Sequence, residues 1–322
     1  SGFLFPSARF SSDLGFGASV PYYFALSPTY DLTLTGTGLT KQGFLGEAEW
    51  RQRFDNGGYN LKIAGIHQAD PEGFSDQNSV NSGRVGDPNK FRGLVASRGQ
   101  FDLNARWQFG WDVLYQTDKN FARTYEIEGY REFIHNSEVY LTGLNDRNYF
   151  DLRGMKIQVQ ENVLDDGQYA TTETQPWVLP TFDYSYTPDE AIAGGELNLD
   201  LNARSILRSR LDDTTFDKDG RLRQDLVQGI EGNSTRVTAE AEWKRSFITE
   251  GGLVVTPLLA FQADTTAVNQ SEGSIAAINA LAAAQGNGVA ADVQSAYHRL
   301  MATAGMELRW PVLFSTSSAS HV

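Results

Sequence analysis

The stretch Val20–Gly36 reads VPYYFALSPTYDLTLTG and holds two runs of strand-forming residues joined at Ser27-Pro28-Thr29. In the second run, apolar and polar residues alternate with a period of two, which is typical of a strand with one apolar and one polar face. Proline has no N–H to give to a strand ladder, yet Pro21 stands at the head of the aromatic run. A strand that lacks a ladder bond suits the edge of a sheet, or a seam that must open.

The same alternation recurs along the chain in about thirteen runs of roughly 9–11 residues, the length with which a tilted strand crosses a bilayer. The clearest run covers residues 105–116, where Trp107 and Trp111 share one face and Gln108 and Asp112 share the other. Such a run fits either a soluble β-sandwich or a membrane barrel. Short turns alternate with long polar loops along most of the chain, and this asymmetry favours an outer-membrane barrel.

In a barrel of this kind, the polar phase of each strand lines a wet interior. Two pairs of carboxylates, Glu47/Glu49 and Glu240/Glu242, lie in that phase. They could serve as acid–base pairs, but lining an interior explains them better. The residues that we expect to line the lumen are Glu47, Glu49, Arg51, Arg53, Gln108, Asp112, Asp200, Glu240 and Glu242.

Composition restricts the function more than the fold. The chain has 322 residues, a net charge of −13 and no cysteine. The charge argues against nucleic acid as a partner, because no basic stripe could neutralise phosphates. The mean hydropathy of −0.38 does not separate a soluble protein from a barrel, because half of every barrel strand is polar. No apolar run reaches the roughly 18 residues of a membrane helix, and residues 1–20 do not resemble a signal peptide.

No catalytic or metal-binding set stands out in the sequence. The four histidines have neither metal-ligand spacing nor a serine–acid arrangement around them. The segment Asp217–Gly220 is faintly similar to a calcium loop, but Leu226 stands where the closing carboxylate belongs. We therefore expect neither an enzyme nor a cofactor. The histidines are His67, His135, His298 and His321.

Two local features are predicted from the pattern. Phe150 and Leu152 share one phase of a strand whereas Met155 takes the other, so we expect a β-bulge at Gly154. The alanine-rich residues 274–284 favour a helix.

Counting strands leaves one conflict. If the strand that begins near Val20 rises from the periplasm, the long loops fall on the periplasmic side, whereas long barrel loops are extracellular. Either an early strand is missing from the count, or one break is misplaced.

A resemblance to a known family rests on the opening motif. Pro21 to Phe24, followed by Ala25-Leu26-Ser27-Pro28 and Tyr30-Asp31-Leu32-Thr33, resembles the start of the barrel of the LptD family, also called organic solvent tolerance protein OstA. Residues 2–6 resemble that family's lead-in from a periplasmic domain, and residues 310–322 resemble a stretch from the middle of its barrel.

The resemblance implies an all-β fold: an antiparallel transmembrane β-barrel, of which this chain supplies about half of some 26 strands. Residues 1–14 are then a lead-in from a periplasmic domain, and residues 15–322 are part of the barrel. It also implies an integral outer-membrane protein of a Gram-negative bacterium that inserts lipopolysaccharide into the outer leaflet. Its implied partners are lipopolysaccharide, outer-membrane lipids, a plug lipoprotein similar to LptE, and periplasmic Lpt bridge proteins that contact the preceding domain.

The resemblance also implies a lateral gate at the first strand: lipopolysaccharide leaves sideways between the first and last strands of the barrel, and prolines in the first two strands weaken the seam. Pro21 matches the first of these prolines, Gly36 stands at the position of the second, and Pro28 matches a turn proline. Glycine keeps its N–H, so Gly36 loosens a strand without removing a bond. The residues that the resemblance assigns to the gate are Pro21, Tyr22, Tyr23, Pro28 and Gly36.

Three other functions stay open at this point. The chain could belong to another outer-membrane pore or transporter, although no plug domain or constriction loop stands out. A soluble sandwich or adhesin array predicts repeats of fixed period, and the strand spacing here is irregular. An outer-membrane enzyme would need a catalytic set.

Overall fold

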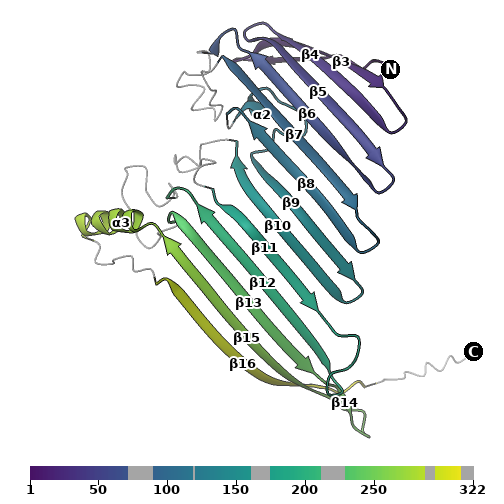
Figure 1. The fold of residues 1–322 in the computed structure, drawn as a ribbon, viewed down its shortest axis with the longest axis vertical. Helices are drawn as coiled ribbons and strands as arrows, with labels where there is room; N and C mark the ends of the chain where they lie inside the picture. Colours follow the sequence, from purple (N-terminus) through teal and green to yellow (C-terminus); the bar gives the residue numbers. More distant parts are fainter. Residues whose placement is uncertain (72–89, 119, 161–174, 212–228, 287–293, 313–322) are drawn as a thin grey trace, which may run out of the picture.

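The computed structural model describes residues 1–71, 90–118, 120–160, 175–211, 229–286 and 294–312. Within these residues the protein is all-β, and sixteen strands form one antiparallel sheet in which almost every strand pairs with its neighbour in sequence (Figure 1). No helix in the described part of the chain is long and apolar enough to cross a membrane.

The strands β1, β2 and β14 are short, and the other strands are about long enough to cross a bilayer. In chain order the strands are β1 Gly2–Phe3, β2 Ser7–Ser11, β3 Gly15–Ala25, β4 Tyr30–Leu39, β5 Gly43–Phe54, β6 Gly57–His67, β7 Phe91–Asp102, β8 Trp107–Gln116, β9 Ile134–Asn145, β10 Asn148–Val159, β11 Trp177–Tyr186, β12 Glu196–Arg208, β13 Gly232–Lys244, β14 Phe247–Ile248, β15 Val254–Gln270 and β16 Ala296–Arg309.

Two helices, α2 (Phe121–Thr124) and α3 (Glu272–Ala284), lie in connections between strands. α3 confirms the helix predicted from the alanine-rich stretch. Ser271 caps it, since its hydroxyl accepts a hydrogen bond from Ser274 N at 3.3 Å.

The sheet begins earlier than the sequence analysis expected. Residues assigned to a lead-in form β1 and β2, and both pair with β3 as two pieces of one broken strand. Sixteen strands therefore make fourteen crossings of the sheet in the described residues, because β1 and β2 count once and β14 lies in the turn between β13 and β15. Residues 1–14 were missed because Pro6 and the short apolar run around it hide the alternation.

This extra strand removes the counting conflict. The strands β6, β8, β10, β12 and β15 all end at one end of the sheet, the long-loop end, and α2 and α3 lie there as well (Figure 1). The opposite, short-turn end holds the turns after β3, β5, β7 and β9. Because the chain enters through β1 at the short-turn end, a periplasmic start puts the long loops outside.

The register divides the side chains between two faces. Cα partners on neighbouring strands point to the same side, so Glu49, Lys62 and Ala96 belong to one row. That side carries most of the charged strand residues and is called the polar face. The other side, the apolar face, carries Trp107, Trp111 and Trp243.

The ladder between β10 and β11 shifts by one residue at the level of Gly154. The predicted bulge is thus at the right level, but the extra residue lies in the neighbouring strand. Leu179 and Pro180 of β11 together stand opposite Gly154, and β11 shows the same shift against β12. Proline suits a bulge because it has no N–H to give to the ladder.

Candidate functional site

The polar face is a surface of paired charges. The register places all nine residues that were predicted to line a lumen on this face. Opposite charges on neighbouring strands pair across the ladder. Examples are Lys62 Nζ with Glu47 Oε2 at 3.3 Å, Arg98 Nε with Asp112 Oδ2 at 2.7 Å, and Arg236 Nη2 with Asp264 Oδ1 at 2.8 Å.

At the long-loop end of β4 to β8 the polar face turns apolar. There a loop, residues 120–133 (the folded loop), lies back on the sheet and buries its side chains against it. Phe121 and Tyr125 are buried, with 0% and 1% of their surface exposed. The strand residues that they meet are Leu39, Leu45, Ala64, Ile66, Leu94, Ala96 and Leu114.

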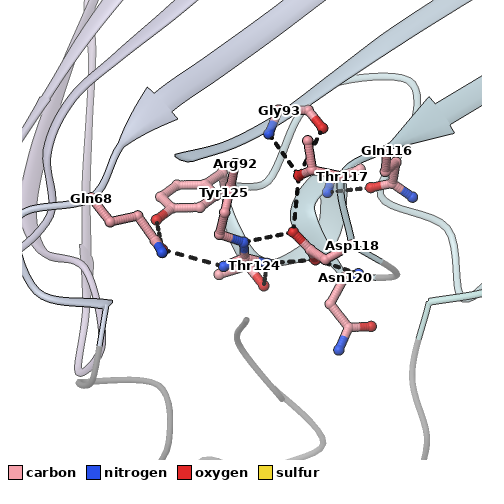
Figure 2. A network of polar contacts seen from close by, with 10 residues as sticks. Gln68, Arg92, Gly93, Gln116, Thr117, Asp118, Asn120, Thr124 and Tyr125 are labelled. Carbon is pink, nitrogen blue, oxygen red and sulfur yellow. Dashed lines mark hydrogen bonds and ion pairs between the residues drawn. The ribbon is translucent and has the colours of Figure 1, made fainter. Parts of the chain in front are cut away.

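A buried ion pair anchors the folded loop (Figure 2). Arg92 of β7 is completely buried, and its Nε and Nη2 donate to the two carboxylate oxygens of Asp118 at 2.7 and 2.8 Å. The guanidinium also lies 5.3 Å from the centre of the Tyr125 ring. Tyr125 in turn donates from its hydroxyl to Gln68 Oε1 at 2.6 Å. A bidentate arginine–carboxylate contact of this kind fixes the orientation of the two side chains as well as their distance.

Backbone groups at the start of the connection are held in the same way (Figure 2). The Gly93 N–H donates to Thr117 Oγ1 at 3.0 Å, and the Ala122 N–H donates to Gln116 Oε1 at 2.8 Å. These contacts leave the loop no freedom to swing away from β7 and β8 without breaking buried hydrogen bonds.

Burial changes the pKa of two phenols in the folded loop. Desolvation raises the pKa of Tyr125 to about 12, against a smaller opposite effect of Arg92. Burial likewise raises the pKa of Tyr130 to about 12, although Arg98 lies over its ring at 4.6 Å. Both side chains are therefore uncharged at any physiological pH.

The seam between the broken first strand and β3, the edge seam, is weakly joined. From the pair Phe3/Tyr22 to the pair Ser7/Ser19, the first strand advances by four residues and β3 by three, so one residue is extra. The Leu4 N–H donates to the Pro21 carbonyl at 3.0 Å. A strand residue directs its N–H and C=O to the same neighbour, so the donor that Pro21 lacks would have faced this seam.

The other residues assigned to a gate are spread around Pro21. Tyr22 lies on the apolar face, where its ring meets Phe3 edge-on at 4.8 Å. Tyr23 lies on the polar face, with Arg51 5.9 Å above its ring. Pro28 lies in the turn after β3, and Gly36 lies in β4 opposite Val20, one strand further from the edge.

The sequence analysis missed the residues that hold the folded loop. The signal was present as apolar residues in the polar phase near strand ends, such as Leu45, Ile66 and Leu114. A strand facing only water on that side would not carry them. Their occurrence at one end of several neighbouring strands indicates a cover over that end.

Some calls fall outside what the structure describes. The calcium-like segment 217–220, Leu226 and His321 are among them. Within the described residues, no group of three or more acidic or histidine side chains could hold a metal ion.

Comparison with known proteins gives one consistent result. The family described as LptD, LPS transport system D, matches residues 90–322. The chain is 28% identical to the LPS-assembly protein LptD of Actinobacillus pleuropneumoniae serotype 7 over 202 residues, which cover 62% of this chain and 24% of that protein. It is 27% identical to the LPS-assembly protein LptD of Pseudomonas putida strain F1 over 260 residues, 72% of this chain and 23% of that protein. The chain thus spans about a quarter of the length of these relatives.

Proposed function

Because the chain belongs to the LptD family of LPS transport proteins, we propose that it forms part of the wall of an outer-membrane barrel that inserts lipopolysaccharide into the outer leaflet. In this proposal the apolar face meets the hydrocarbon and the polar face lines the lumen. The sheet supports it, because its charged residues share one face and its large aromatic residues share the other.

The observation that carries the proposal is the construction of the edge seam. In a bilayer, each backbone group that loses its partner costs several kcal/mol, so a fully bonded wall does not part easily. At the edge seam one donor is absent at Pro21 and one residue is extra beside Pro6. Both features lower the cost of moving the first strand, and so support a lateral gate at this seam.

The proposed gate therefore consists of the broken first strand and β3, with Pro21 as the weakening residue. Tyr22, Phe3 and Phe24 form an aromatic cluster on the apolar side of this seam, with ring centres 4.6 to 4.8 Å apart. Such side chains present an apolar, rigid surface to the acyl chains of a passing amphiphile.

The partners follow from the same assignment. A plug lipoprotein similar to LptE would occupy the lumen against the charged polar face of β11 to β13, away from the folded loop. Lipopolysaccharide would arrive from periplasmic Lpt bridge proteins at the short-turn end, where the chain enters the sheet. The wall itself lies in the outer membrane, with the long loops outside.

The test is the substitution Pro21→Ala in the full-length protein. Alanine restores an N–H that faces Leu4, so the edge seam gains about one hydrogen bond and export of newly made lipopolysaccharide to the cell surface slows. Pro188→Ala is the matched control, because Pro188 lies in the turn after β11, far from the edge seam, and contributes no ladder position. Equal export by the Pro21 variant and the control, at equal protein levels, would remove the basis for the gate.

A further inference from the structure

The ladder is interrupted a second time in the middle of the wall. β8 and β9 pair over only six residues, from Trp107/Gly143 to Asp112/Glu138, whereas β9 and β10 pair over twelve. Beyond Asp112 the two strands part toward the long-loop end. We call this the inner seam.

Side chains take over the hydrogen bonds that the inner seam loses. The Leu114 N–H donates to Ser137 Oγ at 3.0 Å, and the Leu114 carbonyl accepts from Gln158 Nε2 at 3.1 Å. Ser137 Oγ and Gln158 Oε1 are themselves 3.2 Å apart. The Leu114 backbone is thus satisfied without a neighbouring strand, as the wall of a membrane barrel requires.

The folded loop closes the inner seam from the polar side. It is tied to β7 by Arg98 Nη2, which donates to the Gly129 carbonyl at 2.9 Å. On the far side it is tied to the end of β10 by Gln160 Nε2, which donates to the Tyr130 carbonyl at 2.6 Å. The folded loop therefore spans the gap on the polar side, from β7 to the end of β10.

On the apolar face the gap forms a groove of about 680 Å³. That volume lies within the usual range of small-ligand sites. Val95, Val113, Val139 and Leu179 line it, and 45% and 48% of the surface of Val95 and Leu179 is exposed. A cavity with such walls holds a hydrocarbon chain better than water.

The end of the groove nearest the long loops has a different character. Tyr115 and Trp177 stand there with 74% and 41% of their surface exposed, as aromatic residues do at a membrane interface. Lys156, whose Nζ lies 4.9 Å from the Trp177 ring, adds a positive charge. From the long-loop end inward, the groove therefore offers a cation, then aromatic rings, then aliphatic side chains. This is the order of an anionic headgroup, its interfacial region and an acyl chain.

We propose that the inner seam binds one lipopolysaccharide molecule, with an acyl chain in the groove and a phosphate group beside Lys156. The choice of lipid rests on the proposed function, which puts the long-loop end outside and so places the headgroup in the outer leaflet. A phospholipid has the same chemical layout, and the experiment separates the two sources.

The experiment uses the full-length protein in two sets of vesicles, one of phosphatidylglycerol and phosphatidylethanolamine alone and one with purified lipopolysaccharide added. A photoreactive benzophenone amino acid replaces Val113 in the groove or, as control, Val237 on β13, which also faces the apolar side with 40% of its surface exposed. We expect the lipopolysaccharide adduct at Val113 to exceed that at Val237 severalfold. Val139→Trp should abolish this excess by filling the groove, and Lys156→Gln should lower it by about threefold, the effect of one partly exposed charge pair.

Equal adduct yields at Val113 and Val237 would overturn the proposal, because both positions would then report only bulk lipid. A phospholipid adduct that persists undiminished when lipopolysaccharide is added would overturn the choice of lipid. The lipid is already in the membrane, so the adduct does not require transport. If the gate proposal fails, the adduct expected at Val113 does not change. If the groove binds no lipid, the gate proposal is not affected.

Discussion

The edge seam and the inner seam interrupt the same ladder in opposite ways. At the edge seam, Pro21 takes a donor away and an extra residue distorts the pairing. At the inner seam, Ser137 and Gln158 return both hydrogen bonds to Leu114, and the folded loop covers the gap. The difference teaches that a break in a barrel wall is not by itself a gate. The seam that lacks bonds is the one that we propose as a gate, whereas side chains supply the missing bonds at the inner seam.

The largest effect is expected from the anchor of the folded loop. Arg92→Met leaves the Asp118 carboxylate in a buried site without its partner, which should lower the free energy of unfolding of the full-length barrel by about 3–5 kcal/mol. Equilibrium unfolding in urea measures this. The double variant Arg92→Met with Asp118→Leu should regain most of the loss, because no lone charge remains.

A charge pair on the open polar face is the matched control. Arg51 and Asp31 lie 2.8 Å apart with 47% of the Arg51 side chain exposed, so Arg51→Ala should cost less than about 1 kcal/mol. Should Arg92→Met cost no more than Arg51→Ala, the folded loop would not be anchored as described, and the inner seam would lack its cover.

A smaller effect is expected within the inner seam itself. Gln158→Leu removes the donor to the Leu114 carbonyl and should destabilise the barrel by about 1–3 kcal/mol. Ser137→Ala frees the Leu114 N–H, so its amide should exchange with solvent deuterium faster than in the parent protein. Ser205→Ala is the comparison, because β12 and β13 stay paired around Ser205. Unchanged exchange at Leu114 would mean that the side chains do not close this seam.

The smallest effect appears only at high pH. Tyr125 and Tyr130 have a pKa raised to about 12 in the folded protein, above the ordinary value of 10.0. Between these values the unfolded chain has released protons that the folded protein still holds, so stability is present below pH 10 and is lost as pH rises toward 12. Absorbance at 295 nm should show a group of phenols that titrates late, and Tyr125→Phe should make that group smaller. Titration of all phenols near their ordinary value would show that the folded loop does not bury them.

The sequence predicted the strands of the wall well, because the period of two in strands such as β8 reflects the different surroundings of their two faces. The nine residues expected to line a lumen share one face in the register, and their contact with a lumen stays a prediction. The sequence did not predict the broken strand that precedes the strand of Pro21, because Pro6 interrupts the alternation there.

The inner seam could not be foreseen. Ser137 and Gln158 are ordinary polar strand residues in the sequence, and only the parting of β8 from β9 brings them to the Leu114 backbone. The folded loop left a trace in Leu45, Ile66 and Leu114, but pairing those residues with Phe121 and Tyr125 requires knowing that the loop turns back on the sheet. Long-range contacts of this kind depend on register, which a pattern of single strands does not contain.

The most direct test of the difference between the seams is a pair of reversible locks in the full-length protein. Ser7→Cys with Ser19→Cys joins directly opposed residues across the edge seam, and Ala239→Cys with Ala263→Cys does the same across the intact pair β13 and β15. With each disulfide verified by mass spectrometry, the amount of lipopolysaccharide reaching the cell surface is measured before and after reduction. Our account predicts that the edge lock alone stops export and that reduction restores it. Undiminished export through a fully locked edge seam would contradict it.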